Sequence, residues 1–282
     1  MSNRYFPNLW IAIPDSSLSD EQTIRDKTVK VCQFARACSI FRVKTIFIYR
    51  DRTVNSSADL SLLKTVLRYL DTPQYLRKLL YPRTNQLEYA GILHPINAPH
   101  HRDWQRIRDV KVGDVRVGVI VKARDGLRVD IGLSDLVPFE GPCFQGKKVN
   151  VKIVSAYPSL RGKEASQQDI KEYWGYEVRE VNNLSKLLES ALNTQILITS
   201  KKGSYLKDKE AQILAGIKAF KNFLIVFGTP KKGVDEMLAL EGSSINAYKY
   251  VLNMFPFQAT KTVRLEEAIL GSLSILNHVL SK

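Results

Sequence analysis

The sequence has few of the residues that build metal sites and disulfide frameworks. Its 282 residues include three cysteines, Cys32, Cys38 and Cys143, and none of them lies in a CxxC motif. A zinc site or a disulfide-stabilised fold is therefore not expected. Long apolar runs are also missing, since segments such as Phe223–Phe227 are far shorter than the roughly 20 residues that cross a bilayer. We expect a cytoplasmic protein with no metal and no membrane segment.

Two common nucleotide-binding motifs are absent as well. No GxGxxG fingerprint occurs, which argues against a Rossmann-type dinucleotide site. The run Gly141–Lys148 matches seven positions of a P-loop, but Lys148 stands where a Ser or Thr would bind magnesium. The run also leads into an alternating segment typical of a strand, whereas a P-loop opens a helix. A nucleotide-hydrolysing enzyme is therefore not favoured.

Positive charge is in excess. Lys and Arg total 42 against 28 Asp and Glu, which gives a formal net charge of +14 at pH 7. The excess is densest in residues 100–168, which carry 13 basic and 8 acidic residues. Such an excess indicates a polyanionic partner such as nucleic acid, although composition alone fits a basic surface without a partner equally well.

The first hundred residues follow a strand–helix–strand pattern. Apolar runs at Leu9–Ile13 and Thr45–Tyr49 predict strands, and the segment Asp20–Ser39 between them has helical spacing. Ser19 with Gln22 predicts a capping box at the start of this helix. Two further helices are expected after the second strand.

In the middle of the chain the period of the pattern changes to two. Residues 115–121, 127–133 and 149–153 alternate apolar with polar or small side chains, and glycine-containing turns separate them. Alternation of this kind predicts strands with one buried face. We therefore expect residues 99–165 to form a small antiparallel β-barrel.

After the barrel, strands and helices alternate again. Strands are expected at Ile196–Thr199, Phe223–Phe227 and Tyr250–Asn253, and a helix follows each of them. Such a series predicts a mostly parallel sheet that is covered on both faces. Residues 1–98 and 166–282 are therefore expected to form one α/β domain into which the barrel is inserted.

The loops after these three strands combine glycine, proline and polar residues. They run from Thr199 to Gly203, from Phe227 to Gly233 and from Asn253 to Ala268. In an open parallel sheet, ligands bind beyond the carboxyl ends of the strands, where such loops converge. Glycine permits close backbone approach and proline stiffens a loop. Any one loop fits a simple connection equally well, but the three together predict a pocket lined by backbone.

These loops also carry a family resemblance. They are similar to the cofactor-binding end of the trefoil-knotted SPOUT RNA methyltransferases, and further segments resemble the archaeal and eukaryotic subfamily with an inserted OB-like domain. The residues that carry the resemblance are Gly228–Gly233, Asn253-x-x-Pro256-x-Gln258, Thr262–Ala268, Tyr89–Pro95, Pro99–His101 and Tyr173–Arg179. The resemblance covers essentially the whole chain. It implies a SPOUT-type α/β knot domain, S-adenosylmethionine as cofactor and a homodimer.

The resemblance also implies a set of cofactor contacts from the three loops. The expected cofactor-binding residues are Thr199, Ser200, Phe227, Gly228, Thr229, Pro230, Gly233, Leu252, Asn253, Phe255, Pro256, Gln258 and Thr262. Arg264 is the predicted catalytic residue, because a uridine nitrogen or a ribose hydroxyl loses a proton on methylation and an arginine stabilises the resulting anion. A phosphate clamp or a structural ion pair with Glu267 is an equal alternative for Arg264.

The inserted barrel is the expected reader of RNA, because OB-like sheets present basic groups to unpaired strands. Its expected RNA-binding residues are Arg116, Lys122, Arg124, Arg128, Lys147, Lys148 and Lys152. By resemblance the substrate is ribosomal RNA, with uridine N3 ahead of the ribose 2′-oxygen. The alternative is a non-catalytic RNA-binding or ribosome-assembly factor that keeps the knot.

Overall fold

The computed structural model describes residues 7–102 and 106–281, which form two compact units. The α/β unit consists of the described residues up to Arg68, of Gln86–His94, and of the chain from Tyr176 onwards. The inserted unit consists of Tyr69–Asn85 and Pro95–Gly175. It is longer than the predicted barrel, because residues 69–85 and 166–175 pack with it.

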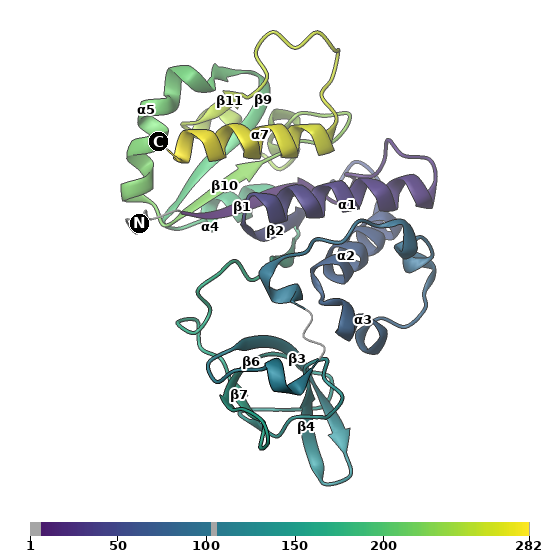
Figure 1. Ribbon diagram of the computed structural model, residues 1–282. Helices are drawn as coiled ribbons and strands as arrows, with labels where there is room; N and C mark the ends of the chain where they lie inside the picture. Colours follow the sequence, from purple (N-terminus) through teal and green to yellow (C-terminus); the bar gives the residue numbers. More distant parts are fainter. Residues whose placement is uncertain (1–6, 103–105, 282) are drawn as a thin grey trace. The chain divides into compact units, whose positions relative to one another are not determined.

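The α/β unit contains a six-stranded parallel sheet (Figure 1). The strands are β1 (Asn8–Pro14), β2 (Val43–Tyr49), β8 (Glu177–Val181), β9 (Thr194–Tyr205), β10 (Asn222–Val226) and β11 (Val251–Asn253). Their order is β11-β9-β10-β1-β2-β8, and every neighbouring pair runs parallel. The predicted parallel sheet is thereby confirmed. The predicted knot remains a prediction.

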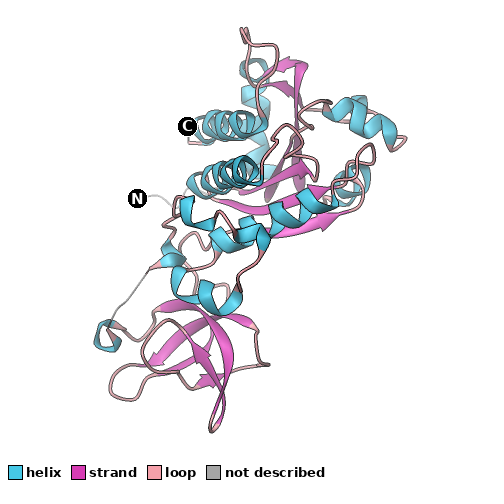
Figure 2. Cartoon of the chain, turned by 90° about the vertical axis from the view of Figure 1, so that its right-hand side faces the viewer, coloured by secondary structure: helices cyan, strands magenta, loops and turns pink. Residues whose placement is uncertain are grey.

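Helices cover both faces of this sheet. On one face, α1 (Ile24–Ile40) and α7 (Leu265–Leu280) lie side by side, as Figures 1 and 2 show. On the other face, α4 (Leu184–Ser190) and α6 (Val234–Leu240) pack on buried strand residues such as Ala12. Because side chains alternate along a strand, the even-numbered residues of β1 support α4 and α6, and the odd-numbered ones point to the opposite face. Two further helices are α2 (Ser57–Asp71) and α5 (Leu206–Ala219).

Helix α1 begins later than predicted. Residues 15–20 form consecutive turns that bury Leu18 completely, and the helix starts only at Ile24. Thr23 is its N-cap, with a side chain that accepts a hydrogen bond from the Asp26 N–H at 3.1 Å. The predicted capping box at Ser19 is therefore wrong, because the first apolar residue after β1 is needed in the core and not in the helix.

Strand β9 is longer than predicted. The sequence placed a loop from Thr199 to Gly203, but the strand continues to Tyr205 and pairs with β11 along its second part. A Cβ on Gly203 would lie 2.6 Å from the carbonyl oxygen of Val251. Glycine therefore allows close strand pairing here and does not mark a loop.

The inserted unit contains a five-stranded sheet in the order β4-β3-β6-β7-β5. Its elements are α3 (Gln74–Leu80), β3 (Val115–Ala123), β4 (Gly126–Asp130), β5 (Phe139–Glu140), β6 (Lys148–Ser155) and β7 (Arg161–Glu164). The prediction of an antiparallel sheet is wrong in one pair, because β5 and β7 run parallel. The alternation itself holds, since Val149, Val151 and Ile153 are buried in a common core with Val129.

Short 3-10 helices complete the secondary structure, at Asn85–Leu87, Ala90–Ile92, Pro99–His101, Ile107–Asp109 and Ile245–Ala247. Within residues 7–102 and 106–281, no helix is both long enough and apolar enough to cross a membrane.

Candidate functional site

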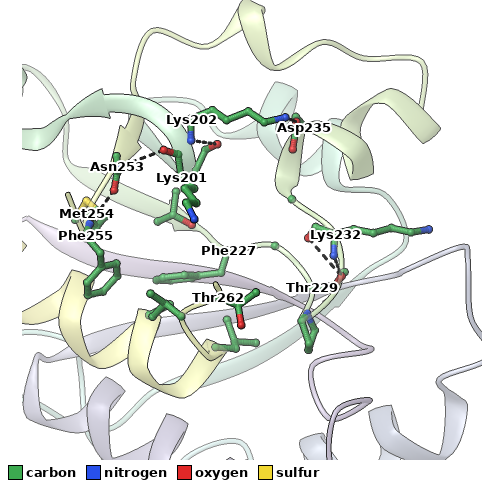
Figure 3. A pocket seen from close by; sticks show the side chains of 18 of the residues that line it. Lys201, Lys202, Phe227, Thr229, Lys232, Asp235, Asn253, Met254, Phe255 and Thr262 are labelled. Carbon is green, nitrogen blue, oxygen red and sulfur yellow. Dashed lines mark hydrogen bonds and ion pairs between the residues drawn. The ribbon is translucent and has the colours of Figure 1, made fainter. Parts of the chain in front are cut away.

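A pocket of about 310 Å³ lies at the carboxyl ends of β10 and β11 and beside residues 199–202 in the middle of β9 (Figure 3). We call it the strand-end pocket. Its walls come from β9, from the loop between β10 and α6, from the loop between β11 and α7, and from α7 itself. Twelve of the thirteen predicted cofactor-binding residues line it, and the exception is Pro256, which is exposed. The volume lies at the small end of the roughly 300–1,000 Å³ typical of ligand pockets.

The floor of the pocket is fixed by the sheet. Phe227 is 1% exposed, its N–H donates to the carbonyl of Ala12 at 3.0 Å, and its carbonyl accepts the Tyr49 hydroxyl at 2.7 Å. The Thr199 hydroxyl donates to the carbonyl of Val226 at 2.8 Å and so ties β9 to β10. Burial of Tyr49 raises the pKa of its hydroxyl well above the usual value, with nearby carboxylates adding to the effect. This hydroxyl therefore stays a neutral donor.

The loop from Phe227 to Gly233 holds itself in shape. The Thr229 N–H donates to the Lys232 carbonyl at 2.9 Å, and the Lys232 N–H donates back to the Thr229 hydroxyl at 2.8 Å. A Cβ on Gly228 would lie 2.6 Å from the same Lys232 carbonyl, so only glycine fits this close turn. The loop is a compact backbone cradle, as the glycine and proline content predicted.

The third loop is anchored by an amide side chain. Asn253 donates through Nδ2 to the Lys201 carbonyl at 3.0 Å and accepts the Phe255 N–H at 2.9 Å through Oδ1. Gln258 donates to the Thr260 carbonyl at 3.0 Å. In the structure, both side chains therefore shape the loop around the pocket. Their predicted cofactor contacts remain a proposal.

Helix α7 adds a residue that sequence reasoning did not place in the site. Ser272 lines the pocket and is fully buried, and among the described residues its hydroxyl has no hydrogen-bond partner. A buried hydroxyl without a partner is costly unless a ligand supplies one. Its neighbour Gly271 lets the Phe255 ring approach, since a Cβ there would lie 2.6 Å from that ring. The two small residues Gly271 and Ser272 within an apolar helix were the sequence signal that could have placed α7 at the pocket.

Five lysines surround the pocket, and sequence reasoning missed all of them. The lining lysines are Lys201, Lys202, Lys231, Lys232 and Lys261, and the lining carboxylates are Asp235 and Glu236. Lys202 lies 3.8 Å from Asp235, as Figure 3 shows. The Lys-Lys pairs, one in β9 and one in the loop before α6, were a readable signal for a positively charged pocket mouth.

Two buried carboxylates lie close to this positive charge, at the ends of β1 and β2. Burial raises the pKa of Asp51. Hydrogen bonds from Thr53 and Ser16 and the charge of Lys232 lower it by more, so the net pKa is below the usual value. For Asp15, burial dominates and raises the pKa. The pKa values of the two neighbouring carboxylates are therefore shifted in opposite directions, and Asp51 is the stronger acid of the pair.

Arg264 does not line the pocket. Its guanidinium contacts the carboxylates of Glu21, Asp20 and Glu266, the last at 2.9 Å from Nε to Oε1. Burial alone would lower the pKa of Arg264, but these three carboxylates raise it. Its backbone N–H donates to Glu267 at 2.9 Å, which caps α7.

Most of the predicted RNA-binding residues of the inserted unit are already partnered within that unit. Arg128 pairs with Asp125, Lys147 with Glu164 at 3.3 Å, Lys148 with Asp71 at 3.5 Å and Lys152 with Asp169 at 2.6 Å. Arg116 is 4% exposed and stacks over the Tyr75 ring at 5.0 Å. Lys122 and Arg124 form no ion pair with any described residue.

Across the described part of the chain, no three His, Cys, Asp or Glu side chains gather in a way that would hold a metal ion. The fold and the pocket together define an α/β protein with a pocket at the carboxyl ends of parallel strands, which is where ligands bind in open parallel sheets.

The chain belongs to the protein family described as "Putative RNA methyltransferase", which matches residues 8–276. The protein is therefore a methyltransferase. It is 30% identical to the 28S rRNA (uridine-N(3))-methyltransferase of Mus musculus, over 95% of this chain and 75% of that protein. The Homo sapiens protein of the same name is also 30% identical, over 95% of this chain and 77% of its own length. An uncharacterized protein of Halobacterium salinarum is 26% identical, over 94% of this chain and 97% of its own length.

Proposed function

We propose that the protein transfers a methyl group from S-adenosylmethionine to N3 of a uridine in ribosomal RNA. The observation that carries the proposal is the match, over almost the whole chain, to relatives named for this reaction, combined with a small-molecule pocket formed by the residues expected to hold the cofactor. Methylation of a ribose 2′-oxygen is the less favoured chemistry, and a non-catalytic assembly factor does not explain the pocket.

The residues present fit S-adenosylmethionine. The cofactor is a flat nucleoside with a charged amino-acid tail, and it needs backbone hydrogen bonds, a close-packed turn and polar partners. The loop from Phe227 to Gly233 offers such a turn, and the buried Ser272 hydroxyl offers a polar group that no described residue satisfies. When bound, the cofactor supplies an electrophilic methyl group on sulfur.

The chain's own task in such a transfer is positioning. Tyr49 and Thr199 hold the pocket floor, and Asn253 ties β11 and its loop to β9, so that the loops need little reordering when ligands bind. The N3 proton of uridine is lost during the reaction, and a cationic side chain near the nucleotide stabilises the anion.

Arg264 is our proposed residue for that role. In the structure its guanidinium contacts three carboxylates, so it reaches a nucleotide only by exchanging these ion pairs for the substrate. The Arg264 side chain is 48% exposed, which leaves it accessible for such an exchange.

Three further features implied by the SPOUT resemblance belong to this proposal. The chain threads a trefoil knot at the strand-end pocket, it works as a homodimer, and the inserted unit is an OB-like module that contacts RNA. A cytoplasmic location, expected from the sequence itself, is part of the same proposal. The curled sheet with its bridge from Val129 to Val137 supports the OB-like assignment.

Mass spectrometry of digested ribosomal RNA, from cells with and without the gene, tests the proposed function. We expect N3-methyluridine at one or a few positions that disappears without the gene. Unchanged ribosomal RNA together with a lost methyl group in transfer RNA would assign another substrate class. Loss of a 2′-O-methyl group would assign the ribose chemistry.

A further inference from the structure

The mouth of the strand-end pocket is more positive than its proposed cofactor requires. Five lysines and two carboxylates line it. One lysine suffices for the single carboxylate of S-adenosylmethionine, whose sulfonium and ammonium groups are themselves positive. The remaining positive charge therefore indicates a second, anionic ligand at the same place.

Three of these lysines have no counter-charge within the described chain. Lys201, Lys231 and Lys261 form no ion pair with any described carboxylate, and all three are exposed. The Lys201 ammonium lies against the backbone carbonyl of Lys261 at 3.4 Å, which brings two of the three segments together. By contrast, Lys202 lies 3.8 Å from Asp235, and the charge of Lys232 interacts with the carboxylate of Asp51.

The three lysines come from three separate walls of the pocket. Lys201 is on β9, Lys231 is in the loop before α6, and Lys261 is in the loop before α7. Each of these segments is held by hydrogen bonds close to its lysine: Asn253 binds the Lys201 carbonyl, the Thr229 hydroxyl accepts the Lys231 N–H at 3.2 Å, and Gln258 donates to the Lys261 carbonyl at 3.4 Å. The lysines thus project from a fixed frame around one opening.

We propose that Lys201, Lys231 and Lys261 form a phosphate-binding rim, which holds the RNA backbone on either side of the nucleotide that enters the strand-end pocket. The inference rests on the proposed function and deepens it, because it assigns the RNA contact nearest the chemistry to the α/β unit itself. When ammonium groups that have no carboxylate partner bind phosphates, the RNA releases its condensed counterions, which favours binding at low salt.

Salt-dependent RNA binding by the full chain tests the rim. The probe is a single-stranded, uridine-containing RNA oligonucleotide, measured without cofactor, and the variant carries Lys201→Ala, Lys231→Ala and Lys261→Ala together. Each phosphate contact to single-stranded nucleic acid contributes about 0.7 to the slope of log affinity against log salt, so the slope should fall by about 2. If the wild type and the variant bind the RNA equally at 1 M salt, this difference in slope corresponds to roughly 50-fold weaker binding of the variant at 0.15 M salt.

A matched control carries Lys44→Ala, Lys186→Ala and Lys221→Ala. These three lysines are also exposed, form no ion pair with a described residue and do not line the pocket, and Lys44 and Lys221 lie at the amino ends of β2 and β10. The control should change the salt slope by less than half as much as the rim variant. Calorimetry of each variant with S-adenosylmethionine should give affinities within about twofold of the wild type.

An equal fall in slope for both triple variants would overturn the rim, since general charge would then explain binding. Loss of cofactor affinity with an unchanged RNA slope would overturn it too, because the lysines would then serve the cofactor. If the slope falls as expected but no RNA is methylated by the wild type, the rim stands and the proposed function fails.

Discussion

The inserted unit and the mouth of the strand-end pocket are both rich in basic side chains, but they use them differently. In the inserted unit, four of the seven predicted RNA-binding residues are held in ion pairs and Arg116 is buried. At the pocket mouth, Lys201, Lys231 and Lys261 have no carboxylate partner among the described residues. The number of lysines and arginines in a segment therefore does not locate a phosphate-binding surface, because pairing within the fold decides how much charge is left for a ligand.

The physical reason is that a paired lysine must give up one partner to gain another. A lysine paired with a carboxylate already has part of its charge balanced within the fold, so its binding to a phosphate adds less net positive charge at the RNA. An unpaired lysine instead contributes its full share of counterion release. On the proposed function, the α/β unit is the part expected to position the reacting nucleotide, and the inserted unit has a smaller share of unpaired positive charge than its composition indicates.

The largest effect is expected from Arg264→Ala, which tests whether the chemistry belongs to the α/β unit. Removing a group that stabilises a developing anion costs about 10²–10³-fold in rate. We expect such a loss in single-turnover methyl transfer, with cofactor affinity largely unchanged. Lys64→Ala, which breaks the Lys64–Glu180 ion pair elsewhere, is the control and should retain the wild-type rate. Loss of cofactor binding with no further fall in rate at saturating cofactor would contradict the catalytic role.

Gly228→Ala closes the cradle of the strand-end pocket. The added Cβ would lie 2.6 Å from the Lys232 carbonyl, and overpacking of this kind costs about 1–3 kcal/mol, up to roughly a 100-fold loss of cofactor affinity. Gly91→Ala is the matched control, because a Cβ there meets no atom within 4 Å. Calorimetry should show weak binding for the first variant and wild-type binding for the second. Equal affinities would place the cofactor elsewhere.

Stability of the inserted unit should depend on pH through His101. Burial, and then the neighbouring His100, lower the pKa of His101 from 6.5 to about 4. A lowered folded-state pKa gives stability that is present above pH 6.5 and is lost as the pH falls towards 4, by roughly 2–3 kcal/mol. Urea unfolding of wild type and His101→Gln from pH 7 to pH 4 measures this. The variant should lose less stability over that range, and parallel curves would show that His101 is not the group.

The smallest effect should separate paired from unpaired residues within the inserted unit. Lys122→Ala with Arg124→Ala removes the two basic residues that form no ion pair with a described residue, which should lower the salt slope of RNA binding by about 1.4 and weaken binding roughly 15-fold at 0.15 M salt. Lys147→Ala with Lys152→Ala removes two paired residues and should weaken binding only about twofold. The reverse order would break the comparison.

Much of the fold could be predicted from local patterns. The spacing of apolar residues predicted five of the six strands of the parallel sheet, all but β8, and placed α7 at Leu265–Leu280, because helices and strands with one buried face repeat their apolar residues at a fixed period. The capping of α1 was not predictable in the same way. Ser19 and Thr23 are both good N-caps, and the choice between them depends on the burial of Leu18, which is a tertiary contact.

The site was predictable as a set of loops but not as a set of roles. Glycine and proline after β10 and β11 correctly indicated a pocket at the carboxyl ends of these strands, whereas residues 199–203, expected as a third loop, belong to β9 itself. The free or paired state of each charged residue depends on partners distant in sequence, such as Asp20 and Glu21 for Arg264 or Asp71 for Lys148. The partnerless Ser272 hydroxyl likewise becomes visible only when α7 packs beside the strand-end pocket.

The most direct test of the account is methyl transfer by the purified chain. The protein is incubated with S-adenosylmethionine carrying an isotopically labelled methyl group and with ribosomal RNA from cells that lack the gene, and the digested RNA is analysed by mass spectrometry. The account predicts labelled N3-methyluridine, absent with Arg264→Ala and strongly reduced with Gly228→Ala. Folded wild-type protein that binds the RNA but leaves its uridines unlabelled would contradict it.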